Sequence, residues 1–229
     1  MIRRMAAPTV ITIDGPAGVG KSTAARGLAQ RLGAVFLDTG AMYRAVTLAA
    51  TEHGIDPAET RSVATLMDTT LFEFRPEADG MRVLINGADK TCAIRDPNIT
   101  EQVKPIAAAA ALRARLVAMQ QAFAARCERV VTEGRDQGTV AFPDAPVKIF
   151  LTADPVERAR RRHNELTAAG KDIALETILN QQQQRDASDE GRAIGPLKPA
   201  ADAIVLDTTH LTVEQVIDAD PGCQVVGRL

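Results

Sequence analysis

A glycine-rich segment that ends in lysine and serine, residues 15–22, carries the clearest chemical signal in the sequence. It reads Gly-Pro-Ala-Gly-Val-Gly-Lys-Ser and follows a β-branched run at residues 9–13. Such glycines let backbone N–H groups surround a phosphate, and a helix N-terminus beyond them adds partial positive charge. Lys21 can bridge two phosphate oxygens, and the Ser22 hydroxyl suits Mg²⁺. We therefore predict a nucleoside triphosphate site, which alone does not separate kinases from GTPases and ATPases.

Two further polar clusters each place an arginine shortly after an apolar run. Arg44 follows the run at residues 34–38, and Arg135 follows the run at residues 130–133. A guanidinium group there can bind phosphate oxygens in a bidentate manner, although a plain surface arginine is an equally good interpretation of either cluster alone. Glu133 or Asp136 could also hold Mg²⁺ through water.

A third cluster contains Arg185, Asp189 and Arg192, at the spacing that places side chains on one face of a helix. A solvated ion-pair surface is the simplest interpretation of this spacing. Arginines at positions 158 and 160–162 concentrate further positive charge in the same part of the chain. Phosphoryl transfer needs such charge, together with a lid that excludes water, so we expect this region to close over a polyanion.

The alternation of apolar runs and helical patterns indicates an α/β protein. Predicted strands cover residues 10–13, 34–38, 130–133, 147–151 and 203–207. Predicted helices cover residues 21–32, 41–52, 107–126 and 212–217, and another begins with Asp154 as N-cap and Pro155 as first helical residue. This order predicts a doubly wound parallel sheet of five strands with helices on both faces. Ligands of such sheets bind at the carboxyl ends of the strands.

Residues 70–91 interrupt this pattern, since two alternating segments separated by turn residues predict an antiparallel hairpin. We expect an inserted subdomain at residues 66–106 and a helical lid at residues 155–195. The core would then comprise residues 8–65, 107–154 and 196–220, with tails at residues 1–7 and 221–229.

Composition bounds the function further. The 229 residues carry a formal net charge of −2, with a pI near 6.0, and only 3% are aromatic. Nucleic-acid and membrane-surface binders usually need a positive excess, so small-molecule partners are expected. Three cysteines without metal spacing fit a reducing compartment, and no signal peptide or membrane span is apparent. We expect a cytoplasmic monomer.

Taken together, four motifs resemble the bacterial cytidylate kinases, a family of nucleoside monophosphate (NMP) kinases, over about residues 8–217. The motifs are Ile-Asp-Gly-Pro at residues 13–16, Leu-Asp-Thr-Gly-Ala-Met-Tyr-Arg at residues 37–44, the segment from Gly134 to Ala145, and the Arg185 cluster with residues 193–197.

The resemblance implies transfer of the γ-phosphoryl group of ATP to CMP or dCMP with Mg²⁺, and a fold with an inserted NMP-binding subdomain and a helical lid. ATP would contact the loop residues Gly15, Pro16, Ala17, Gly18, Val19, Gly20, Lys21, Ser22 and Thr23. CMP would contact Thr39, Arg44, Arg113, Arg135, Asp136, Arg185, Asp189 and Arg192. The catalytic charges would be those of Lys21, Arg135, Arg185 and Arg192, and the metal would bind Ser22, with Glu133 acting through water.

In this family pattern, Asp136 and Arg113 would read cytosine. A carboxylate and a guanidinium match the edge of cytosine, which offers an N4 amino donor beside N3 and O2 acceptors. Uracil would present an oxygen to Asp136, and a buried acceptor left unpaired is costly. The resemblance therefore predicts selection of CMP over UMP.

The sequence departs from the family in two places and leaves two alternatives open. Lys104 and Pro105 stand where the family places a small hydroxyl residue near the base, and the last helix is short. Another small-molecule kinase, for uridylate, adenylate or a non-nucleotide acceptor, would share the loop and the lid. A GTP-binding switch has less support, because the sequence lacks the guanine-reading pattern Asn-Lys-x-Asp.

Overall fold

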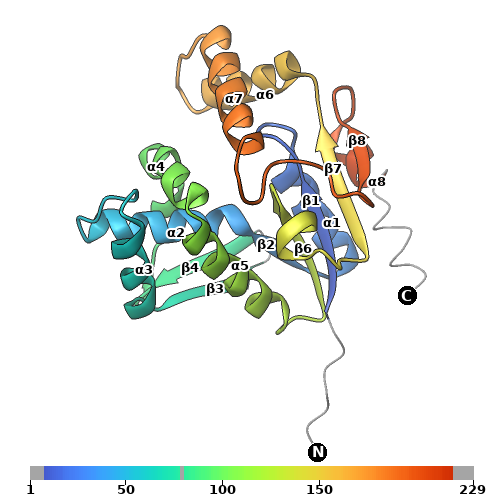
Figure 1. Cartoon of the computed structure of the whole chain (residues 1–229). Helices are drawn as coiled ribbons and strands as arrows, with labels where there is room; N and C mark the ends of the chain where they lie inside the picture. The colour runs from blue at the N-terminus through green and yellow to red at the C-terminus, as the bar shows by residue number, and fades with distance from the viewer. Residues whose placement is uncertain (1–7, 78–79, 219–229) are drawn as a thin grey trace, which may run out of the picture.

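The computed structural model describes residues 8–77 and 80–218 (Figure 1). The predicted tails at 1–7 and 221–229 lie outside these residues, as do one of the three cysteines, Cys223, and residues 78–79 between the two segments of the predicted hairpin.

Five parallel strands form the central sheet, as predicted, in the order β2-β6-β1-β7-β8. They are β1 (Thr9–Asp14), β2 (Val35–Asp38), β6 (Arg129–Gly134), β7 (Val147–Thr152) and β8 (Ile204–Asp207). In the register, Asp14 pairs with Gly134 and Asp38 with Glu133, so the polar segments that follow β1, β2 and β6 begin at the same edge.

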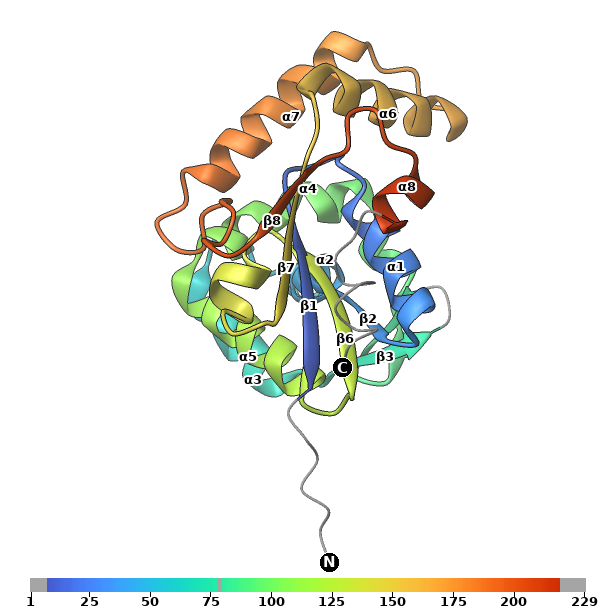
Figure 2. The same cartoon turned by 90° about the vertical axis from the view of Figure 1, so that its right-hand side faces the viewer.

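Helices cover both faces of this sheet, which confirms the predicted doubly wound architecture (Figure 2). They are α1 (Lys21–Leu32), α2 (Thr39–Glu52), α3 (Thr60–Thr69), α4 (Pro97–Ala108), α5 (Ala110–Ala124), α6 (Pro155–Ala168), α7 (Leu175–Glu190) and α8 (Val213–Asp218). Successive strand residues point to opposite faces. Accordingly, Val10 and Val130 join a core with α2, α4 and α5, whereas Ile11 and Val131 join a second core with α1 and α8.

A small antiparallel sheet of β3 (Phe72–Glu77), β4 (Gly80–Ile85) and β5 (Ala88–Asp89) confirms the predicted hairpin. Asn86 and Gly87 have positive φ angles of 49° and 80°, as a tight hairpin turn requires. This sheet packs beside α2 and α3, away from α6 and α7 (Figure 1). The limits and motions of the insert and the lid stay predictions.

The predicted single helix over residues 107–126 was wrong, because the chain is extended at Ala109 and separates α4 from α5. The Ala107 carbonyl accepts a hydrogen bond from Nη1 of Arg113 at 2.9 Å instead of continuing the helical pattern. The start of α4 was missed, although Asp96 as N-cap before Pro97 is a recognisable signal. The predicted start of α6 at Asp154 and Pro155 is confirmed.

Among the helices described here, none combines the length and hydropathy that crossing a membrane would require.

Ile149 of β7 is only 1% exposed, so shortening it to alanine should cause a large loss of stability. Ile149→Ala should lower the free energy of unfolding by about 2–5 kcal/mol, because it removes buried methylene groups and leaves a cavity. Urea denaturation measures this change. Val156→Ala, at a position 53% exposed, is the control and should stay within about 0.5 kcal/mol of the wild type. Equal losses in both variants would contradict the assigned core.

Candidate functional site

The glycine-rich loop lies between β1 and α1, at the carboxyl edge of the sheet. Gly15 has a φ of 150°, and a side chain there would collide with the Leu151 carbonyl of β7, so only glycine fits. Val19 is buried in the core and anchors the loop, and its carbonyl accepts a hydrogen bond from the Thr208 hydroxyl at 3.2 Å. Core packing and this hydrogen bond thus hold the shape of the loop.

Lys21 begins α1 and is nearly buried, at 6% exposed. Its ammonium group donates to the Pro16 carbonyl at 2.6 Å. Burial, and then the nearby Arg135 guanidinium, lower the pKa of Lys21 to about 7, against a weaker opposing effect of Glu133. A phosphate anion in the loop would reverse this shift, since an opposite charge favours the protonated amine.

Ser22 and Glu133 lie together beside the loop. The Ser22 hydroxyl donates to Oε1 of Glu133 at 3.0 Å, and the Glu133 carbonyl accepts from the Thr39 hydroxyl at 2.7 Å. A hydroxyl and a carboxylate are oxygen ligands of the kind that Mg²⁺ prefers. The residues present therefore fit the predicted metal, directly at Ser22 and through water at Glu133.

Two carboxylates orient the arginines that face this edge. The Arg44 Nη2 atom lies 3.2 Å from Oδ2 of Asp38, which also caps α2 by accepting from the Ala41 N–H at 2.8 Å. Asp189 pairs with both Arg135, at 2.8 Å, and Arg192. Although burial opposes the effect, these two guanidinium groups lower the pKa of Asp189 below its ordinary value.

The sequence spacing placed Arg185, Asp189 and Arg192 on one helical face, but α7 ends at Glu190. Arg192 therefore lies beyond the helix and reaches Asp189 by a turn of the chain. Arg185 stays on α7 and is exposed.

Arg113 and Asp136 form a buried ion pair, with side chains 3% and 6% exposed. Tyr43 flanks Arg113, whose guanidinium carbon lies 5.9 Å from the ring centre. Gly195 packs directly on the pair, and a side chain there would strike both charged groups. A carboxylate and a guanidinium are thus held next to each other, as the prediction for Asp136 and Arg113 requires.

A further ion pair joins the predicted lid to the loop, and sequence reasoning did not find it. Arg158 of α6 pairs with Asp186 of α7. Arg158 donates to the Ala17 carbonyl at 3.0 Å, and Asp186 accepts from the Ala17 N–H at 3.3 Å. No local sequence pattern indicates this pair, because its two members lie 28 residues apart on different helices.

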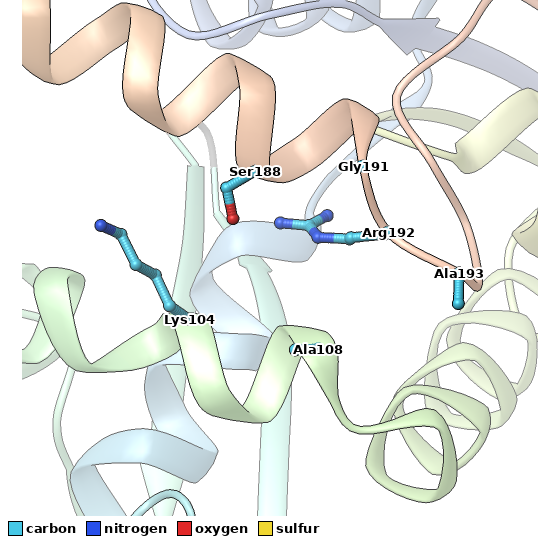
Figure 3. A pocket seen from close by; sticks show the side chains of 6 residues that line it. All are labelled: Lys104, Ala108, Ser188, Gly191, Arg192 and Ala193. Atoms are coloured by element: carbon cyan, nitrogen blue, oxygen red, sulfur yellow. The ribbon is translucent and has the colours of Figure 1, made fainter.

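Two pockets adjoin these groups. One, of about 290 Å³, lies between α4 and the end of α7, and Figure 3 shows Ser188 and Arg192 extending into the space opposite α4. Its lining residues are Lys104, Ala108, Ser188, Gly191, Arg192 and Ala193. The second, of about 210 Å³, is lined by Ser22, Arg26, Asp38, Arg44, Arg95, Thr100 and Glu133. The sequence did not indicate Arg26 or Arg95 of the second pocket. Lys104, which departs from the family pattern, lines the first pocket.

Comparison with known proteins identifies a consistent set of relatives. The sequence profile of the family described as cytidylate kinase matches residues 11–220. A cytidylate kinase of Pelotomaculum thermopropionicum is 48% identical over 90% of this chain and 92% of that protein. Cytidylate kinases of Mycobacterium avium (45% identical, 93% and 94% covered) and Corynebacterium glutamicum (44% identical, 91% of each covered) are similarly alike.

The environment of Lys21 predicts that this side chain takes up a proton when a polyphosphate binds. Because the Lys21 pKa is about 7 without ligand and should rise beside phosphate, ADP binding at pH 8 should approach an uptake of one proton. Calorimetric titration with ADP in buffers of different ionisation enthalpy measures this number. The uptake should vanish at pH 5.5, where Lys21 is protonated in both states.

Lys21→Met is the control for this titration, since methionine has a similar length and no charge. Any residual ADP binding by this variant should occur without proton uptake at pH 8. Uptake as large as that of the wild type would assign the proton to another group.

Proposed function

The chain belongs to the cytidylate kinase family, and from this premise we propose that it transfers the γ-phosphoryl group of ATP to CMP or dCMP. The products are ADP and CDP or dCDP. The observation that carries the proposal is the buried pair of Arg113 and Asp136, which lies at the same edge of the sheet as the glycine-rich loop.

The pair offers cytosine the groups that complement its edge. The Asp136 carboxylate accepts from the N4 amino group, while the Arg113 guanidinium donates to the ring acceptors. Both side chains are buried, so a base that leaves either group unpaired is penalised. The close packing of Gly195 limits how far the pair can move to suit another base.

In this proposal, separate groups of residues bind the phosphates of the donor, ATP, and the phosphate of the acceptor, CMP or dCMP. The loop N–H groups and Lys21 hold the donor phosphates, whereas Thr39, Arg44, Arg135 and Arg192 surround the acceptor phosphate. Arg185 and Asp189 approach the ribose. Supporting this arrangement, Asp38 orients Arg44, and Asp189 orients Arg135 and Arg192 by ion pairs.

Catalysis in this proposal rests on position and charge. Lys21, Arg135, Arg185 and Arg192 stabilise the negative charge on the transferring group, and α6 and α7 exclude water from it. The acceptor phosphate is already ionised, so no general base is needed. Ser22, and Glu133 through water, would hold Mg²⁺, which would supply positive charge that neutralises part of the charge of the phosphates.

All of these groups come from one chain, so the proposal requires only a monomer acting on ATP and a pyrimidine nucleotide. A cytoplasmic enzyme fits the free thiols of Cys92 and Cys127.

Offering CMP, dCMP, UMP and AMP separately with ATP·Mg²⁺, and measuring ADP formation, tests this function. We expect kcat/KM for CMP to exceed that for UMP by about 10-fold to 100-fold, which corresponds to one buried acceptor left unpaired. Equal values for CMP and UMP would contradict base reading by Asp136 and direct attention to Lys104, which lines the adjacent pocket. Turnover with none of the four nucleotides would overturn the function.

Replacing Glu133 by glutamine tests its link to the metal, because the amide keeps the shape of the side chain and removes the charge. Glu133→Gln should raise the Mg²⁺ concentration for half-maximal activity by about tenfold or more. A Mg²⁺ titration at fixed ATP and CMP measures this value. Glu176→Gln, at an exposed position of α7, is the matched control and should leave the titration unchanged. An unaltered titration for Glu133→Gln would exclude it from the metal site.

A further inference from the structure

Asp14 is a buried carboxylate for which the proposed chemistry has no direct use. It ends β1, immediately before Gly15 of the loop, and is only 4% exposed. Its oxygens bind the segment that follows β6. Oδ1 accepts from the Gln137 N–H at 2.9 Å, and Oδ2 accepts from the Gly138 N–H at 2.8 Å.

These two N–H groups begin a short π-helix, η2 (Gln137–Ala141), and therefore have no partner inside it. The same turn closes through the Asp136 carbonyl, which accepts from the Ala141 N–H at 3.1 Å. Asp136 and Gln137 are adjacent, so the bonds to Asp14 fix the backbone next to the residue that faces the base.

The turn has little freedom to move in other directions. The Gln137 side chain accepts from Thr132 at 3.0 Å and donates to Gln120 at 3.3 Å. A side chain on Gly138 would lie only 2.9 Å from the Thr12 hydroxyl oxygen. The segment is therefore seated against β1, and Asp14 provides its two main-chain attachments there.

Burial disfavours the ionised form of the Asp14 carboxylate. Burial raises its pKa to about 6, although the bonds from Gly138 and Gln137 oppose that shift. Among the charged groups near it, Asp136 raises the pKa and Lys21 lowers it. An asparagine would suit the burial better but has one acceptor oxygen for two N–H donors. The geometry thus requires a carboxylate rather than any small polar side chain.

We propose that Asp14 is a positioning residue for base selection: by holding the Gln137 and Gly138 N–H groups, it sets where the Asp136 carboxylate meets the nucleobase. This inference rests on the proposed function. Asp14 would then support two segments at once, because it precedes Gly15 of the glycine-rich loop and also binds the turn that follows Asp136.

Asp14→Asn tests the inference through the ratio of kcat/KM for CMP to that for UMP. The ratio should fall by about tenfold, the size expected when one buried hydrogen bond to the base is misaligned. The loss should appear mainly in the KM for CMP, while the KM for ATP stays within about twofold. A residue needed only for stability would change the amount of folded enzyme without changing the ratio.

Two further variants complete the design. Ile11→Val is the control, since Ile11 is buried on the same strand but packs into the core on the face covered by α1; its ratio should match the wild type. Gly138→Ala displaces the same turn while keeping the Asp14 carboxylate, and should lower the ratio even if Asp14→Asn does not fold.

The wild-type arm separates the two hypotheses. A wild type that prefers CMP, with an unchanged ratio in folded Asp14→Asn or in Gly138→Ala, overturns the inference and leaves the proposed function standing. A wild type that does not prefer CMP over UMP overturns base reading by Asp136 and the inference with it, whereas turnover with none of the four nucleotides overturns the proposed function.

Discussion

The in-register pairing of β1 with β6 is the constraint on which the rest of the site depends. It places Asp14 opposite Gly134, so that the glycine-rich loop and the turn at residues 137–141 leave the sheet at the same level. The pairing of β2 with β6 adds Asp38 beside Glu133. A one-residue slip would exchange the buried and polar faces of these strands, so the aliphatic cores on both faces hold the register as well.

Positive charge is concentrated in the site. Burial and the nearby Arg135 lower the pKa of Lys21 to about 7, and an anion beside the ammonium group would oppose that shift. Carboxylates such as Asp38 and Asp189 orient the arginines, at distances of 3.2 Å and 2.8 Å from Arg44 and Arg135. Groups held in this way need little reorganisation when charge develops during phosphoryl transfer.

Close backbone approach completes the arrangement. Gly15 lies against the Leu151 carbonyl, and Gly195 lies against the Arg113–Asp136 pair, at positions where any side chain would displace its neighbours. The break between α4 and α5 at Ala109 also helps to hold Arg113 in place, because it leaves the Ala107 carbonyl able to accept a hydrogen bond from Arg113. On the other side, Arg158 and Asp186 bind the backbone of Ala17 and bring α6 and α7 onto the loop.

The sequence by itself determined the phosphate loop, the five strands and the hairpin, because glycine spacing, β-branched runs and turn residues act over a few neighbouring positions. The family resemblance also named Arg113 and Asp136 together. Only the tertiary structure decided that Asp14 binds a turn 123 residues away. It also decided that Arg158 and Asp186 form hydrogen bonds with the backbone of Ala17, and that Arg192 lies beyond the end of α7. Such contacts follow from strand register, burial and helix packing, which couple residues far apart in the chain and leave no local pattern in the sequence.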